Sequence, residues 1–145
     1  MKHISEYLRE LAGNGRYNEV LKQVQDLGKE LAEREIARFD IIIQLQEAKR
    51  DLALREAEIV AEVAVEVDEN GKRKFTNEAL RKAEVEKRKT EDHSYAHIYE
   101  LVKALERTLV EYDAETKRLE VDLKARWAWL RFIEARLRAA AALSS

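Results

Sequence analysis

The 145-residue sequence contains no cysteine, no proline and only four glycines. Without cysteine the chain has no disulfide framework, thiol nucleophile or cysteine-bound metal, and a reducing, cytoplasmic compartment is expected. Without proline, helices much longer than the globular average are permitted. No apolar run approaches the ~18 residues of a membrane span, and the first residues lack the apolar stretch of a signal peptide. We therefore expect no membrane contact.

Charged residues are abundant instead, at 39% of the chain, although the net charge is only −2. High contents of Glu, Lys, Arg, Ala and Leu are typical of long helices and coiled coils. The length suits one domain. We therefore expect a single elongated all-α domain over residues 1–145.

The strongest pattern is an apolar seam in the second half of the chain, whose steps alternate between four and three residues. This heptad spacing keeps one helix face turned toward a partner helix, as in a coiled coil. Its polar members are Thr116 and Arg126. The seam and two nearby tryptophans predict an interface that comprises Leu105, Leu109, Tyr112, Leu119, Leu123, Trp127, Trp129, Leu130 and Leu137.

The first half predicts two helices. A short helix over residues 5–12 should end at the Gly13-Asn14-Gly15 break, because glycine and asparagine favour positive φ. A long helix is then expected over residues 18–62. Its apolar seam is less regular than the later one, since three arginines occupy positions where apolar residues are expected. These are Arg34, Arg38 and Arg55.

Residues 63–75 change from helical periodicity to alternation and contain Asn70-Gly71, the strongest two-residue hairpin signal. We therefore predict a small β-hairpin, which is marginal by itself and must rest on the helix ends or on another subunit. Thr76 or Asn77 should cap a final helix over residues 77–142. The expected fold is a long antiparallel coiled-coil helical hairpin with the β-hairpin at its tip.

The near-neutral net charge conceals a basic zone in and after this β-hairpin. Residues 72–90 carry eight positive and three negative charges. Such a zone, together with one aromatic side chain, can hold nucleic acid without reading its sequence; it can equally be an ordinary solvated surface. The candidate nucleic-acid residues are Lys72, Arg73, Lys74, Phe75, Arg81, Lys82, Lys87, Arg88 and Lys89.

Trp127 and Trp129 are two residues apart and so lie on different faces of a helix. Both cannot enter one narrow seam. We expect one of them to pack against the N-terminal helix or a second subunit, because tryptophan is enriched at interfaces. Base stacking and docking of another protein are the alternatives.

Signals for catalysis are weak. His93 and His97 share a helix face at a spacing that suits a metal, but Ser94 replaces the glutamate of a helical zinc-protease motif. We find neither the second acidic motif of a magnesium-dependent nucleotide hydrolase nor a glycine-rich phosphate loop. We therefore expect no enzyme activity, no cofactor and no metal.

The stretch from Asn70 to Val85 resembles a pattern in small helical proteins of phages and prophages, over roughly residues 60–137. The matching positions are Gly71, Lys72, Phe75, Asn77, Glu78 and Arg81. The resemblance implies an accessory role on DNA, since such genes often lie near recombination and replication functions. The helix, hairpin, helix order also resembles the beta subunit of prefoldin, which implies a chaperone.

We therefore expect a non-enzymatic, homo-oligomeric accessory protein of phage-type DNA recombination or replication, which binds single- or double-stranded DNA through its basic tip. The alternative is a protein-binding scaffold or prefoldin-like chaperone module whose basic tip only keeps the surface solvated. A metal-dependent nucleotide hydrolase is a third, weaker alternative.

Overall fold

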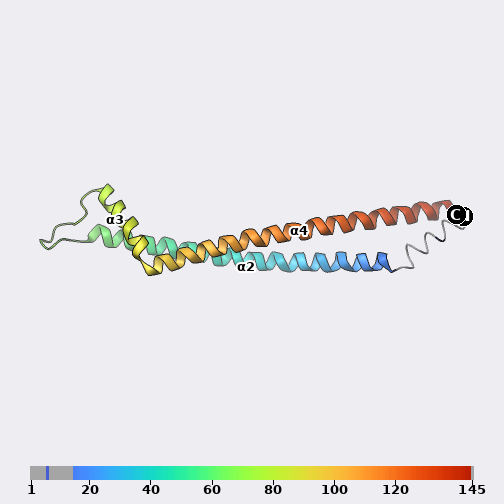
Figure 1. The fold of residues 1–145 in the computed structure, drawn as a ribbon, viewed down its shortest axis with the longest axis horizontal. Coiled ribbons are helices and arrows are strands. Elements are labelled where there is room, and N and C mark those ends of the chain that lie inside the picture. Colours follow the sequence, from blue (N-terminus) through green and yellow to red (C-terminus); the bar gives the residue numbers. More distant parts are fainter. Residues whose placement is uncertain (1–5, 7–14, 145) are drawn as a thin grey trace. The chain divides into compact units, whose positions relative to one another are not determined.

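The structure is a computed structural model that describes residue 6 and residues 15–144. Its helices are α2 (Arg16–Val65), α3 (Glu78–Glu91) and α4 (His93–Ser144), drawn in Figure 1. Within the described residues there is no strand, and the predicted all-α class is confirmed. The predicted short helix over residues 5–12 lies, apart from Glu6, outside the described residues.

The chain divides into two compact units, and α2 and α4 each contribute to both. Unit 1 comprises Met1–Ala37 and Tyr112–Ser145, and unit 2 comprises Arg38–Glu111. The helix predicted over residues 18–62 begins earlier, at Arg16, because the Gly15 carbonyl already accepts the Glu19 N–H at 2.8 Å. None of the helices in the described part of the chain is long and apolar enough to cross a membrane.

In unit 1, the first part of α2 and the last part of α4 lie side by side and run in opposite directions (Figure 1). The Tyr17 hydroxyl, near the start of α2, donates to Glu134 near the end of α4 at 2.8 Å. This bond raises the pKa of Tyr17 above its ordinary value. The buried apolar residues of unit 1 are Val24, Leu130, Ile133 and Ala140.

In unit 2, the remaining parts of α2 and α4 also pack against each other. Leu45 and Ala48 of α2 form a buried cluster with Val102 of α4. Leu52, Leu105 and Leu109 are partly buried around this cluster. Two of these six residues, Leu105 and Leu109, belong to the seam that the sequence predicted.

The buried and half-buried residues of α4 follow the predicted heptad spacing. Every seam position from residue 105 to residue 137 is buried or half-buried. The same alternation of three and four residues runs along α2. Its buried or half-buried positions are Val24, Leu27, Leu31, Arg34, Arg38, Ile41, Leu45, Ala48, Leu52, Arg55 and Ile59.

The predicted β-hairpin over residues 63–75 is wrong in extent. Val63 is 1% exposed and still helical, because it packs into a core with Ile59 and so extends α2 to Val65. After α2 the chain makes a tight turn closed by one antiparallel bridge, between Val67 and Arg73. Gly71 has a φ of 76°, a conformation that costs glycine little. The Asn70-Gly71 signal therefore marked the turn correctly but not two strands.

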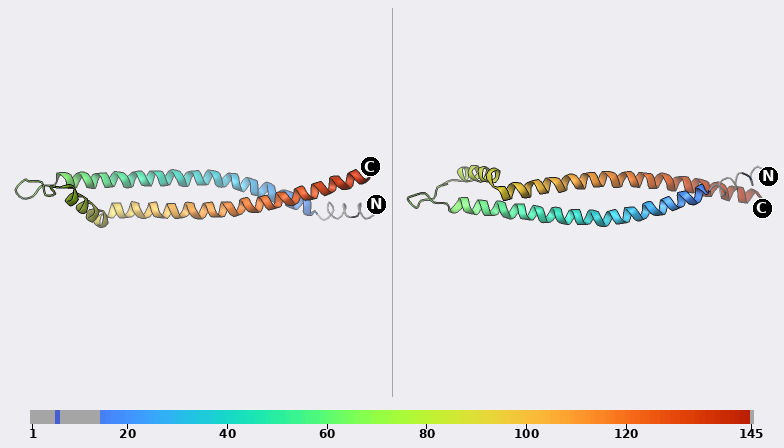
Figure 2. Two further views of the ribbon diagram at one scale, coloured as in Figure 1. Left: turned by 90° about the horizontal axis from the view of Figure 1, so that it is seen from above. Right: turned by 60° about the horizontal axis from the view of Figure 1, so that its bottom comes forward.

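A second core cluster lies where α2, the turn, α3 and α4 meet in unit 2. Ile59 and Val63 of α2 pack against Val85 of α3, and Phe75 and Tyr95 cover them. The Asn77 side chain caps α3 by accepting the Leu80 N–H at 2.8 Å, as predicted. Figure 2 shows α3 at an angle to α4 in its left view.

The predicted continuous helix over residues 77–142 is also wrong, because it is interrupted at Asp92 between α3 and α4. Asp92 adopts extended backbone angles, with φ −82° and ψ 115°. There is no glycine or proline from residue 78 to residue 144, so the break does not come from a residue that opposes helix. Its cause is a set of side-chain contacts.

Candidate functional site

The nine candidate nucleic-acid residues are divided between the turn and α3, both in unit 2. Lys72, Arg73, Lys74 and Phe75 lie in the turn, and the other five lie on α3. The fold therefore brings them into one unit, as predicted. Their surroundings separate them into paired and unpaired groups.

Arg88 and Lys89 form ion pairs that tie α3 to neighbouring segments. Arg88 pairs with Glu66 before the turn and with Glu84 at 2.9 Å, while Lys89 pairs with Glu56 of α2 at 2.6 Å. Hydrogen bonds to these carboxylates raise the pKa of both cations, and the Arg88 bond lowers the pKa of Glu66. These two cations therefore hold the fold together and are already neutralised.

Three further cations of the basic zone have weaker partners. Lys74 lies 3.8 Å from a Glu66 oxygen, and Lys82 lies 3.3 Å from Glu78 on a highly exposed face. Arg81 donates to the Phe75 carbonyl at 3.4 Å. Exposed ion pairs contribute little stability, so phosphate oxygens can compete for Lys74 and Lys82.

Phe75 is half-buried and packs against the cluster of Ile59, Val63 and Val85. The charged ends of Lys74 and Arg88 lie 5.8 and 5.9 Å from its ring centre. Base stacking requires an accessible ring face. The position of Phe75 therefore suits anchoring the turn better than stacking on a base.

Lys72, Arg73 and Lys87 are the remaining cations of the zone. All three are exposed, and within the described residues their side chains form no ion pair. Asp68 accepts the Lys72 backbone N–H at 3.0 Å, which fixes the turn but leaves the lysine side chain in solvent. These three cations are the part of the predicted nucleic-acid surface that is open to a ligand.

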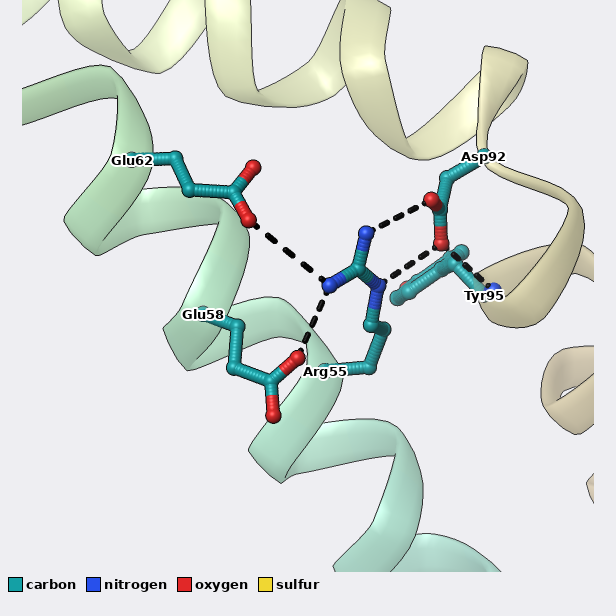
Figure 3. Close-up of polar contacts among 5 residues, drawn as sticks. All are labelled: Arg55, Glu58, Glu62, Asp92 and Tyr95. Carbon is teal, nitrogen blue, oxygen red and sulfur yellow. Dashed lines mark hydrogen bonds and ion pairs between the residues drawn. The ribbon is translucent and has the colours of Figure 1, made fainter. Parts of the chain in front are cut away.

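The most organised polar cluster of unit 2 was not predicted and centres on Arg55 (Figure 3). The Arg55 guanidinium of α2 donates to both carboxylate oxygens of Asp92, at 2.9 and 2.7 Å. Its third nitrogen lies 2.8 Å from Glu58 and 3.9 Å from Glu62. We call the Arg55–Asp92 pair the clasp.

The clasp also organises the start of α4. Asp92 accepts the Tyr95 N–H at 2.8 Å, so the same carboxylate that binds Arg55 caps the helix. The Arg55 bonds and the Tyr95 bond lower the pKa of Asp92 to about 2, and Asp92 in turn raises the pKa of Arg55. Both groups therefore remain charged at neutral pH, and α3 must end where Asp92 meets Arg55.

The sequence did contain a signal for this break. If the α4 seam is continued toward the N-terminus from Val102 in alternating steps of four and three residues, it passes through Ile98 and Tyr95 and reaches Glu84. The buried apolar residue of α3 is instead its neighbour Val85. The apolar pattern therefore changes phase by one residue between α3 and α4. Aspartate is also a favoured N-cap residue, and Asp92 stands three residues before Tyr95, the position whose N–H an N-cap side chain accepts.

In unit 1, the two polar members of the predicted seam have polar partners on α2. Thr116 accepts a 2.9 Å hydrogen bond from Arg34, whose guanidinium also lies 3.9 Å from the Tyr112 ring centre. Arg126 pairs with Gln23 of α2 and with Asp122. One irregular position of the α2 seam, Arg34, therefore faces a polar member of the α4 seam, whereas Arg126 binds Gln23, which lies outside the α2 stripe.

The two tryptophans of the C-terminal zone have different surroundings. Trp129 is half-buried, with Arg16 of α2 5.8 Å from its ring centre. Trp127 is 40% exposed, and Arg131 of its own helix lies 5.9 Å from its ring centre. Within unit 1 the two tryptophans therefore differ as expected, since Trp129 lies beside the start of α2 and Trp127 faces outward. Packing against the short N-terminal helix or a second subunit stays a prediction.

The other predicted interface residues line the seam itself. Leu130 is fully buried, and Leu105, Leu109, Tyr112, Leu119, Leu123 and Leu137 are half-buried. Within each unit, these side chains lie on the α4 face that follows the heptad stripe. They are therefore covered to a large extent by this chain itself.

His93 and His97 are both exposed. Among the residues that the structure describes, no group of three or more His, Cys, Asp or Glu side chains is arranged to hold a metal ion. Comparisons with models of protein families, with curated proteins and with solved structures find no match to this chain. The surfaces of the two units are therefore the guide to function.

Proposed function

We propose that this protein is a non-enzymatic coiled-coil scaffold that associates with a second copy of itself and binds other proteins through the outer faces of its helices. The observation that carries this proposal is a mismatch in apolar burial. In the described residues, fifteen large apolar side chains are exposed while ten apolar residues are buried. Apolar residues on outer faces favour protein contacts when they are grouped.

Two exposed phenylalanines, one in each unit, are the candidate contact positions, and of the two only Phe39 has an exposed large apolar residue one helical turn away. Phe39 of unit 2 is 62% exposed and shares a helix face with Ile43, four residues further along α2. Phe132 of unit 1 is 52% exposed on α4. Neither position belongs to a heptad stripe, since the stripes pass through Arg38 and Ile41 on α2 and through Leu130 and Ile133 on α4.

A structural role for the charged side chains supports the non-enzymatic part of the proposal. The groups with shifted pKa values, such as Arg55, Asp92 and Lys89, pair with charged partners from another segment of the chain. Structural networks of ion pairs shift pKa values as catalytic sites do. Here each shift has an ion pair or hydrogen bond as its cause.

The test is sedimentation velocity of the wild type beside Phe39→Glu and Phe132→Glu. We expect a dimer or larger assembly that dissociates when either charge enters an apolar contact between copies. Gln44→Glu is the control, because Gln44 is exposed and lies on a different face of α2 from Phe39. A wild-type protein that is monomeric at all concentrations contradicts self-association, and binding of an unfolded protein would then favour the chaperone-like form of the scaffold.

A second proposed function is nucleic-acid binding, as an accessory protein of phage-type DNA recombination or replication. The observation that favours it is the exposed group of Lys72, Arg73 and Lys87, which have no ion pair within the described residues. Three phosphate contacts are enough for weak, salt-dependent binding that does not depend on sequence.

Fluorescence anisotropy of labelled single-stranded and duplex DNA tests this second function. Three contacts predict a loss of about 40-fold in duplex affinity between about 50 and 200 mM salt. Replacement of Lys72, Arg73 and Lys87 by Glu should abolish binding, whereas the same change at Lys22, Lys117 and Lys124 should weaken it only slightly. Equal loss in both triple variants would assign the binding to overall charge and contradict a site at the turn.

A further inference from the structure

We propose that Asp92 is the centre of a two-state elbow. In the bent state, the clasp holds α3 at an angle to α4; when Arg55 releases Asp92, α3 and α4 join into one helix. The proposal concerns unit 2 alone and does not depend on either proposed function.

The break between the two helices is confined to one residue. α3 ends at Glu91 and α4 begins at His93, and only Asp92 has extended backbone angles. Aspartate is a mediocre helix former but not a helix breaker of the kind that proline is. Because the residues on both sides of Asp92 are already helical, a change of Asp92 to helical backbone angles would make α3 and α4 one helix.

Backbone hydrogen bonds favour the joined state. A continuous helix would join the N–H groups of His93, Ser94 and Tyr95 to carbonyls four residues earlier. In the broken state the Asp92 carboxylate replaces only one of these bonds, the one at Tyr95. Joining the helices therefore regains backbone hydrogen bonds and loses the cap and the clasp. It also separates Arg88 and Lys89 from Glu66 and Glu56, and Val85 from its core neighbours on α2, so these contacts hold the bent state together with the clasp.

Arg55 keeps partners in both states. Glu58 and Glu62 are on the same helix as Arg55 and lie 2.8 and 3.9 Å from its guanidinium. When Asp92 leaves, these carboxylates still compensate the Arg55 charge. Release of Asp92 therefore does not leave the Arg55 guanidinium unpaired, which would cost free energy.

The elbow also controls a surface feature. A groove of about 380 Å³ lies between Glu86 and Lys89 of α3 and Tyr95 and Tyr99 of α4. The two tyrosine rings are stacked, 6.3 Å apart at their centres. Because the two walls belong to different helices at an angle, the groove exists only while the elbow is bent.

The experiment measures the distance between spin labels on α3 and α4. The chain has no cysteine, so Ala83→Cys and Ala104→Cys introduce two unique sites, both exposed and on either side of Asp92. In one continuous helix these residues are about 32 Å apart along the axis, at 1.5 Å per residue. A bent elbow must give a shorter distance.

We expect the wild-type background to give a single short distance by pulsed electron paramagnetic resonance. Arg55→Gln should add a population near 32 Å, and Asp92→Ala, which removes both the clasp and the cap, should make it dominant. Glu58→Gln is the matched control: it changes a neighbour of Arg55 but leaves Asp92 bound, so the short distance should persist.

Three results would overturn the proposal. The first is a wild-type distribution centred on the continuous-helix distance. The second is an unchanged short distance in both Arg55→Gln and Asp92→Ala. The third is a broad distribution with a loss of helical circular dichroism, because α3 would then unfold instead of joining α4.

Discussion

Arg34 in unit 1 and Arg55 in unit 2 occupy equivalent positions in the buried stripe of α2, yet they have opposite effects on the helix that faces them. Arg34 stacks on the Tyr112 ring and binds Thr116, and α4 continues past it without interruption. Arg55 binds the carboxylate of Asp92, and the facing helix breaks there. The partner of a half-buried arginine therefore decides, in these two places, whether the facing helix continues.

The physical reason lies in the second bond that each partner can make. The Thr116 hydroxyl also donates to the Tyr112 carbonyl at 2.9 Å, a bond that is compatible with a helical backbone. Asp92 accepts the Tyr95 N–H, which is the bond of an N-cap and requires non-helical angles at Asp92. Both arginines have hydrogen-bond partners, but only the partner of Arg55, Asp92, interrupts a helix.

The largest expected effect comes from substitutions that remove apolar packing, which both units contain. Ile59→Ala in unit 2 and Leu130→Ala in unit 1 each delete a side chain that is at most 1% exposed. We expect each to lower the free energy of unfolding by about 2 to 5 kcal/mol, measured by urea denaturation. Leu101→Ala, on an exposed position, should change it by less than about 0.5 kcal/mol. Equal losses in all three variants would mean that the two cores do not dominate stability.

Replacing Arg34 tests the unit 1 side of the comparison. Arg34→Met keeps much of the side-chain volume but loses the contact with the Tyr112 ring and the bond to Thr116. We expect a loss of about 1 to 2 kcal/mol in the free energy of unfolding, with α4 still continuous by amide hydrogen exchange. Fast exchange that emerges around Thr116 would show that Arg34 does hold the facing helix.

Removing the other N-cap of unit 2 sharpens the role of Asp92. Asn77→Ala deletes a cap that has no arginine partner, and we expect a loss of about 1 kcal/mol in the free energy of unfolding. Thr76→Ala is its neighbour and control, and should have a smaller effect. If Asn77→Ala instead disrupts the angle between α3 and α4, the turn rather than the clasp sets that angle.

The smallest effect is an acid-dependent step that belongs to unit 2. The Asp92 pKa is lowered from 3.8 to about 2. The clasp therefore stabilises the folded state fully when the pH is above the ordinary pKa of 3.8, and this contribution is lost as the pH falls toward 2. The thermal unfolding midpoint of the wild type should fall over this range. The step should be absent in Asp92→Asn and retained in Arg34→Met; a wild-type midpoint that matches Asp92→Asn throughout would contradict the charge pairing.

The sequence was sufficient to predict the helical class, the seam of α4 and a cap at Thr76 or Asn77, of which the structure shows Asn77, because each depends on local or periodic signals. Apolar residues at heptad spacing must be covered, and in the structure the seam positions between Leu105 and Leu137 are buried or half-buried. The Asn70-Gly71 turn also followed from local chemistry, since Gly71 takes the positive φ that this turn requires.

The features that could not be predicted from the sequence depend on contacts between distant residues. A helix-cap signal at Asp92 is present in the sequence, but the pairing that holds Asp92 in place needs Arg55, thirty-seven residues earlier in the chain. The number of unpaired cations in the basic zone depends on Glu56 and Glu66, whose positions relative to α3 are not visible from charge counts. The length of α2 depends on packing of Val63 against Val85, which overrides the alternation that favoured a strand.

The most direct test is the set of backbone Cα chemical shifts of the wild-type protein by NMR across residues 88–96. We predict helical shifts on both sides of Asp92 and a departure toward extended values at Asp92 itself, which Arg55→Gln should reduce. Uninterrupted helical shifts through Asp92 in the wild type would contradict the claim that an arginine's partner decides where the helix breaks.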